Sequence, residues 1–145
     1  MQALTSGSSV ELDVQHDSIQ LEIFDKVPPW AIAHAARDNS TAPLILEGDV
    51  AVVKCDGCAG YYPKDGGLYL IEYVCKAHGH FGLERRTREI IQAAKRKGGW
   101  YALPYARTYR GKKVFVAADG PYADEIVMSE KILGPVIGIY RPRAI

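Results

Sequence analysis

Residues 38–53, DNSTAPLILEGDVAVV, contain the pattern that decides the fold. A polar segment around Ser40 runs into the apolar triplet Leu44-Ile45-Leu46, and Gly48-Asp49 then leads into the β-branched run Val50–Val53. Gly-Asp is a turn signal, and β-branched residues favour strands. The stretch therefore predicts a loop, a turn and a strand. It also raises the question whether Ser40 is a nucleophile or an ordinary turn residue.

Length and charge restrict the classes of protein to which the chain can belong. Its 145 residues suffice for one domain, which we place at residues 18–145 after a polar, flexible arm at residues 1–17. The formal charge of +1 provides no overall field toward nucleic acid or an anionic membrane. No apolar run approaches the roughly 20 residues of a membrane span, and no signal-peptide pattern is visible. We expect a cytoplasmic protein with no membrane partner.

The segments around this stretch predict a mainly β fold with one short helix. Further strands are expected at residues 19–24, 68–74, 81–86, 100–103, 114–117 and 132–140. Residues 30–36 fit a short helix or a strand equally well. The one clear helix is expected at Thr87–Lys97, where isoleucines and alanines stand among charged residues. Asp119–Tyr122 is expected to be a turn.

The order of these motifs resembles the LexA/UmuD-type self-cleaving serine peptidase domain of phage repressors and SOS regulators. Ser40-Thr41-Ala42-Pro43 comes first, Gly48-Asp49 opens a strand, Asp65-Gly66-Gly67 opens the next, and residues 132–138, ILGPVIG, close the domain. The resemblance covers roughly residues 19–141 and rests on the order of short motifs. It implies a LexA/signal-peptidase-like, mostly antiparallel β fold that dimerises through its C-terminal strand.

The same resemblance implies a serine nucleophile and a neutral lysine base, which attack a bond in the N-terminal arm. Ser40 stands at the serine position, but Arg85 and Arg86 stand where the lysine is expected. Arginine has a pKa above about 12 and cannot replace a lysine as the base. Lys76 is the nearest other lysine and a poor candidate, because a solvated turn lysine keeps its charge. The site is therefore expected to be degenerate.

Cysteine and histidine spacing predicts a different kind of site. A C-x2-C pair is followed by a C-x2-H pair, and the four residues are Cys55, Cys58, Cys75 and His78. Two such pairs suit tetrahedral zinc, which would then be structural because all four ligands come from the protein. The alternative is that the cysteines are small packing residues. Apart from this structural zinc, no cofactor is expected.

A basic cluster near the expected helix suggests a nucleic-acid patch with Arg88, Arg96 and Lys97 as contacts, against the alternative of a solvated helix face. Taken together, the sequence predicts a phage- or SOS-type regulatory domain that acts as a dimerisation and interaction module. A homodimer is expected, with a regulatory protein or DNA as a further partner. Two alternatives remain open: an active Ser-Lys self-cleaving peptidase, and a zinc-stabilised nucleic-acid or protein-binding module.

Overall fold

A computed structural model describes residues 19–55, 61–76, 84–106, 108–109, 112–113 and 117–142. Its elements, in chain order, are β1 (Glu22–Phe24), β2 (Ile32–Ala35), β3 (Val50–Val53), β4 (Leu68–Lys76), β5 (Glu84–Arg96), β6 (Gly99–Leu103), β7 (Thr108–Tyr109), β8 (Lys112–Lys113), β9 (Asp119–Tyr122), α2 (Glu125–Ser129) and β10 (Ile132–Tyr140). The fold is mainly β with one short helix in the described part, as the sequence predicts.

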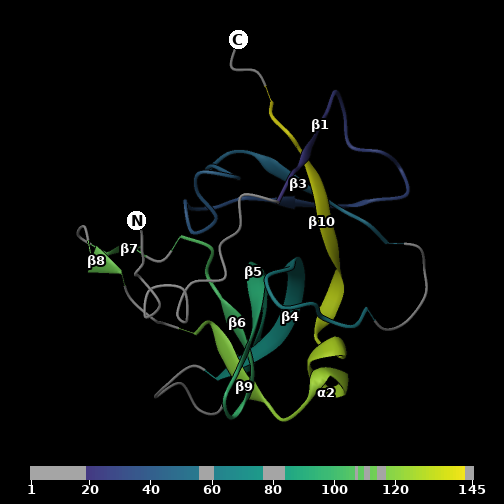
Figure 1. Ribbon diagram of the computed structural model, residues 1–145. Coiled ribbons are helices and arrows are strands. Elements are labelled where there is room, and N and C mark those ends of the chain that lie inside the picture. The colour runs from purple at the N-terminus through teal and green to yellow at the C-terminus, as the bar shows by residue number, and fades with distance from the viewer. Residues whose placement is uncertain are drawn as a thin grey trace, which may run out of the picture.

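Eight strands form one sheet in the order β2-β3-β10-β4-β5-β6-β9, with β1 added beside β10. All described pairs are antiparallel except β1 with β10. The central strand β10 joins two halves of the sheet, because Val136–Tyr140 pairs with β3 and Ile132–Pro135 pairs with β4. Figure 1 shows β10 running from α2 at one end to β1 and β3 at the other.

Two glycines of β10 allow the backbones of neighbouring segments to lie close to this strand. A Cβ atom on Gly134 would overlap the carbonyl oxygen of Lys54, and one on Gly138 would overlap the carbonyl oxygen of Glu22 and the ring of Phe24. Backbone approach of this kind is open to glycine alone. The two glycines of the ILGPVIG motif therefore fix the position of β10 between its neighbours.

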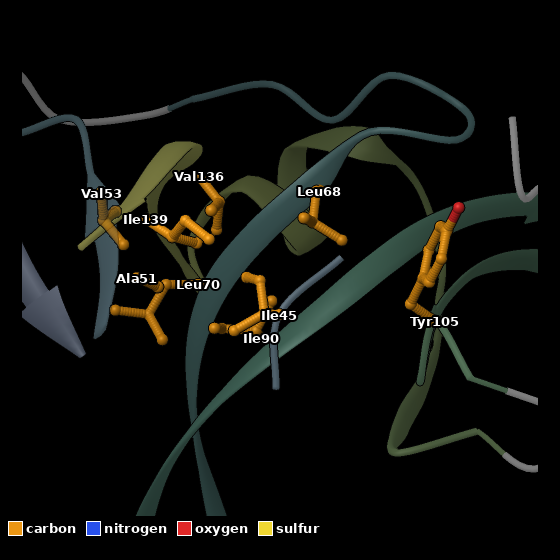
Figure 2. Close-up of a cluster of buried hydrophobic side chains, with 9 residues drawn as sticks. All are labelled: Ile45, Ala51, Val53, Leu68, Leu70, Ile90, Tyr105, Val136 and Ile139. Atoms are coloured by element: carbon orange, nitrogen blue, oxygen red, sulfur yellow. The ribbon is translucent and has the colours of Figure 1, made fainter. Parts of the chain in front are cut away.

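The core consists of apolar clusters on opposite faces of β4 and β5. Leu68 and Leu70 point into the cluster drawn in Figure 2, together with Ile45, Ala51, Val53, Ile90, Tyr105, Val136 and Ile139. Tyr69 and Ile71 alternate onto the other face, where they join Ile91, Ala93, Trp100, Ala102, Tyr122, Met128 and Ile132. Both faces are buried at Leu68–Ile71 and at Ile90–Ala94, so in these parts of the strands apolar residues do not alternate with exposed polar ones.

The helix expected at Thr87–Lys97 is wrong, because these residues belong to the long strand β5. Five consecutive residues from Ile90 to Ala94 are buried, with side chains alternating between the two faces of the sheet. An apolar run buried on both faces cannot be distinguished from a helix by its periodicity. The buried Gln92 fits this position because its side-chain amide donates to the carbonyl oxygen of Gly66 at 3.0 Å.

The remaining segments divide between confirmed and corrected expectations. Residues 32–35 of the ambiguous segment form strand β2, and Asp119–Tyr122 is strand β9 rather than a turn. The strand expected at residues 19–24 is limited to β1, and that expected at residues 81–86 is the start of β5 as far as the structure describes it. Residues 1–18, and most of the strand expected at residues 114–117, lie outside the described residues.

Candidate functional site

The loop between β2 and β3 carries Ser40 and is closed at its base by backbone pairing. Ala36 N–H donates to the carbonyl oxygen of Asp49 at 2.8 Å, and Gly48 N–H donates to that of Ala36 at 3.0 Å. At the far end of the loop, Ala106 N–H donates to the carbonyl oxygen of Ser40 at 2.8 Å. The serine therefore has a backbone position fixed from both sides.

The hydroxyl of Ser40 is paired with a neighbouring carboxylate. Ser40 N–H donates to Asp38 Oδ1 at 3.0 Å. Hydrogen bonds from the backbone and then from the side chain of Ser40 lower the pKa of Asp38. A carboxylate with a lowered pKa is a weak base. This arrangement is that of an Asx turn, which holds the loop, and it does not activate a nucleophile.

Ser40 lies on a cavity of about 540 Å³ between its own loop and the outer part of β5. The described lining residues come from the segment 34–41, from β4 and from β5. They are His34, Ala36, Arg37, Asp38, Ser40, Thr41, Glu72, Arg85, Arg86, Thr87, Arg88, Glu89 and Ile90. The cavity therefore joins Ser40 to Arg85 and Arg86, the residues at the expected lysine position.

Lysine is absent from the described lining of this cavity. Lys76 is the last residue of β4, where its backbone pairs with Glu84, and its side chain lies outside the description. Arg85 and Arg86 are both exposed, and an arginine side chain does not serve as a general base in place of lysine. The described residues thus supply the serine of the expected dyad and no base that fits the lysine position.

A carboxylate and two arginines organise the β5 wall of the cavity. Glu72 Oε1 accepts from Arg86 Nη1 at 3.1 Å, and Glu72 Oε2 accepts from Arg88 Nε at 2.9 Å. The hydrogen bond from Arg88, opposed in part by desolvation, lowers the pKa of Glu72. Because cross-strand neighbours share a face, the three side chains stand on the face of β4 and β5 that carries Leu70 and Ile90.

His34 of β2 lines the opposite wall, and the sequence analysis missed it. Burial lowers the pKa of His34, and the charges of Arg37 and Arg88 lower it further. The neutral form of the imidazole is therefore favoured. Its position in an alternating segment with alanines, WAIAHAA, is compatible with an inward-facing strand residue, but only the pairing of β2 with β3 fixes that face.

The four candidate zinc ligands are only partly described. Cys55 follows β3 and is half-buried, Cys75 is a backbone partner of Arg85 in β4, and Cys58 and His78 lie outside the described residues. Lys54, beside Cys55, lies level with the start of β4 on the other side of β10, since Lys54 N–H donates to the carbonyl oxygen of Pro135, the register partner of Tyr69. Cys75 lies six residues further along β4, roughly 20 Å at about 3.3 Å per residue.

This separation weighs against one zinc ion held by both cysteine pairs, since ligands of one ion lie within about 4 Å of each other. In the part of the chain that the structure describes, no cluster of three or more histidine, cysteine, aspartate or glutamate residues could hold a metal.

The candidate nucleic-acid residues separate because β5 is a strand. Arg88 lines the cavity, whereas Arg96 ends β5 and Lys97 follows it. Eight residues of strand place Arg88 and Arg96 about 26 Å apart. Arg96 Nη1 lies 3.7 Å from Asp65 Oδ1. The basic helix face expected from the sequence therefore does not form, and the charges divide between the two ends of β5.

Comparisons with protein-family models, with curated proteins and with solved structures found no match. Among the described helices, none is long and apolar enough to cross a membrane. The function must therefore be argued from the cavity itself.

Proposed function

We propose that this chain is a phage- or SOS-type regulatory domain of the LexA/UmuD kind, whose serine site no longer cleaves. The domain acts as an interaction module, and its serine cavity binds rather than reacts. The proposal includes a cytoplasmic location and a regulatory protein or DNA as a partner.

The contact between Ser40 and Asp38 carries this proposal. A serine becomes a nucleophile when a base of suitable pKa accepts its proton. The hydroxyl of Ser40 faces Asp38, and the lowered pKa of that carboxyl group makes it a poor acceptor. Arg85, Arg86 and Arg88 line the other side of the cavity, and a guanidinium group donates hydrogen bonds and accepts none. The described residues of the cavity thus offer hydrogen-bond donors beside Ser40 and no lysine, which supports binding in place of cleavage.

A homodimer is part of the same proposal, with one geometric restriction. The strand β10 pairs with β3 on one side and with β1 and β4 on the other. Along Gly138–Tyr140 the backbone of β10 is paired on both sides within the chain, so a dimer formed at this end of the strand would use side chains. Sedimentation equilibrium measures the oligomeric state, and a monomer at all concentrations would contradict this part of the proposal.

Incubation of the purified protein at alkaline pH, followed by intact-mass measurement, tests the loss of cleavage. We expect the wild-type chain to keep its full mass over the whole incubation, as Ser40→Ala does. Alkaline pH favours a neutral lysine, so the conditions give a Ser-Lys dyad its best opportunity.

A single cut within residues 1–17 that disappears in Ser40→Ala would overturn the proposal. Loss of the same cut in Lys76→Ala, with Lys97→Ala as the matched control, would then establish Lys76 as the base. Loss in His34→Gln would instead assign that role to the imidazole that shares the cavity with Ser40.

A further inference from the structure

We propose that the cavity beside Ser40 binds a small phosphate-bearing ligand through Arg37, Arg86 and Arg88. These three guanidinium groups belong to two walls of one cavity, the segment before Ser40 and the strand β5. Arginine offers a planar fork of donors that matches the oxygen atoms of an oxyanion. A tetrahedral phosphate presents oxygen atoms in several directions, so it can be contacted from both walls.

The carboxylates of the cavity do not remove its capacity for an anion. Each of the three has a described partner within the protein: Asp38 accepts from Ser40, Glu89 accepts from the Tyr73 hydroxyl at 2.7 Å, and Glu72 accepts from Arg86 and Arg88. Among the described residues Arg37 and Arg85 form no ion pair. Arg37, Arg86 and Arg88 thus line the cavity beside carboxylates that are already engaged.

Glu72 holds the two β5 arginines without neutralising both. One carboxylate contacts two guanidinium groups, each through a single nitrogen atom, at 3.1 and 2.9 Å. The contacts restrict the rotamers of Arg86 and Arg88 and leave other N–H donors of each fork available. Less side-chain entropy is then lost when an anion binds.

The surroundings of His34 support a positive electrostatic potential inside the cavity. Arg37, from the loop, and Arg88, from β5, both act on this one imidazole in the direction that disfavours a second positive charge. The charged groups around His34 in the described cavity are these arginines together with Arg85, Arg86, Asp38, Glu72 and Glu89. An anion between the walls would reverse the effect and stabilise the imidazolium form.

A small ligand fits this charge distribution better than a nucleic-acid strand. Strand binding needs a basic stripe that follows successive phosphates. Here the arginines meet in one cavity of about 540 Å³, whereas Arg96 and Lys97 lie at the opposite end of β5. The phosphate group could be free or part of a small phosphomonoester, and the two sources are distinguished by their affinities.

The test is an NMR titration of the full chain with inorganic phosphate and, separately, with adenosine monophosphate. Of the four histidines, His34 is identified by the signal lost in His34→Gln. We expect either ligand to shift this signal and to raise the pKa of His34. Tighter binding of the monophosphate would identify an organic phosphate as the ligand, and equal affinities would identify the phosphate group alone.

Variants with opposite expected effects separate binding from folding. Arg88→Gln should weaken phosphate binding about tenfold, because a charge-assisted hydrogen bond is lost. Glu72→Gln should strengthen it, because Arg86 and Arg88 are freed from a competing carboxylate. The matched control Lys97→Gln, with the same charge change at the far end of β5, should bind as the wild type does.

The proposal is overturned if millimolar phosphate and adenosine monophosphate leave the His34 signal unmoved. It is also overturned if Glu72→Gln and Arg88→Gln change the affinity in the same direction, or if a short oligonucleotide binds more tightly than both small ligands. The inference is independent of the proposed loss of cleavage, because binding is measured at His34 and cleavage by intact mass.

Discussion

Asp49 and Glu72 each hold arginine side chains, but in contrasting surroundings. The Asp49 side chain is 5% exposed, and both its oxygen atoms accept from Arg141, at 2.8 and 2.9 Å. It also accepts from Leu46 N–H at 2.9 Å, which closes the loop before β3. The Glu72 side chain is 23% exposed, lines a cavity, and divides its two oxygen atoms between two arginines.

The comparison suggests different roles: Asp49 and Arg141 stabilise the fold, whereas Glu72 and its two arginines line a cavity and are available to the proposed ligand. Asp49 joins the Gly-Asp turn to the residue after β10, and it does not line the cavity beside Ser40. Glu72 and its arginines can exchange partners, because solvent and the cavity reach them. Both carboxylates are charged, so we expect burial and the number of protein partners to decide how much each contributes to stability.

The largest effect on stability is expected where β10 packs against its neighbours. Gly134→Ala should lower the free energy of unfolding by about 3 kcal/mol or more, because the added methyl group must displace the backbone at Lys54. Urea denaturation monitored by circular dichroism measures this. The comparison variant Gly98→Ala, at the turn after β5, meets no atom nearer than 4.0 Å but has a φ of 99°, so it measures backbone strain without overlap and should cost less, about 1–2 kcal/mol. Similar losses in both variants would contradict the packing role of Gly134.

Asp49→Ala should lower the free energy of unfolding by less, about 2 kcal/mol at pH 7, because a part-buried hydrogen bond from Leu46 N–H loses its acceptor. The hydrogen bond from Arg141 lowers the pKa of Asp49, so the folded state binds fewer protons at this group than the unfolded state. Its contribution is therefore present above the unfolded pKa, about 3.9, and is lost as the pH falls through the folded pKa.

Unfolding curves of wild type and Asp49→Ala should accordingly converge as the pH falls below about 4. Glu47→Ala, which removes an exposed carboxylate from the same loop, is the matched control and should behave as the wild type does. A constant difference between the wild type and Asp49→Ala at every pH would show that the carboxylate charge has no part in the effect.

The sequence predicts the bounds of strands β3 and β10 correctly. β3 begins and ends as predicted, at Val50 and Val53, and β10 spans the predicted Ile132–Tyr140. Both are short apolar runs bounded by turn signals. β5 was predicted incorrectly, because its inner half is buried on both faces and its outer half is polar where it lines the cavity. Such a strand has no alternation to reveal it.

The site could be predicted in part. Motif order predicted that Ser40 and the start of β5 belong to one site, and the cavity contains Ser40, Arg85 and Arg86. The role of Glu72 required the register that places it opposite Arg88, and that of His34 required the pairing of β2 with β3. Neither long-range pairing can be derived from local sequence patterns.

The most direct test of the contrast between the two carboxylates is the pKa of His34 in Arg88→Gln, measured by NMR beside the free energy of unfolding. Removal of Arg88 deletes a positive charge that acts on His34, so we expect that pKa to rise. The free energy of unfolding should stay within about 0.5 kcal/mol of the wild type, because exposed ion pairs contribute little. Arg86→Gln, which breaks the other contact of Glu72, is the matched control and should move the pKa less. An unchanged His34 pKa together with a loss of stability as large as that of Asp49→Ala would contradict the account, because Glu72 and Arg88 would then belong to the fold.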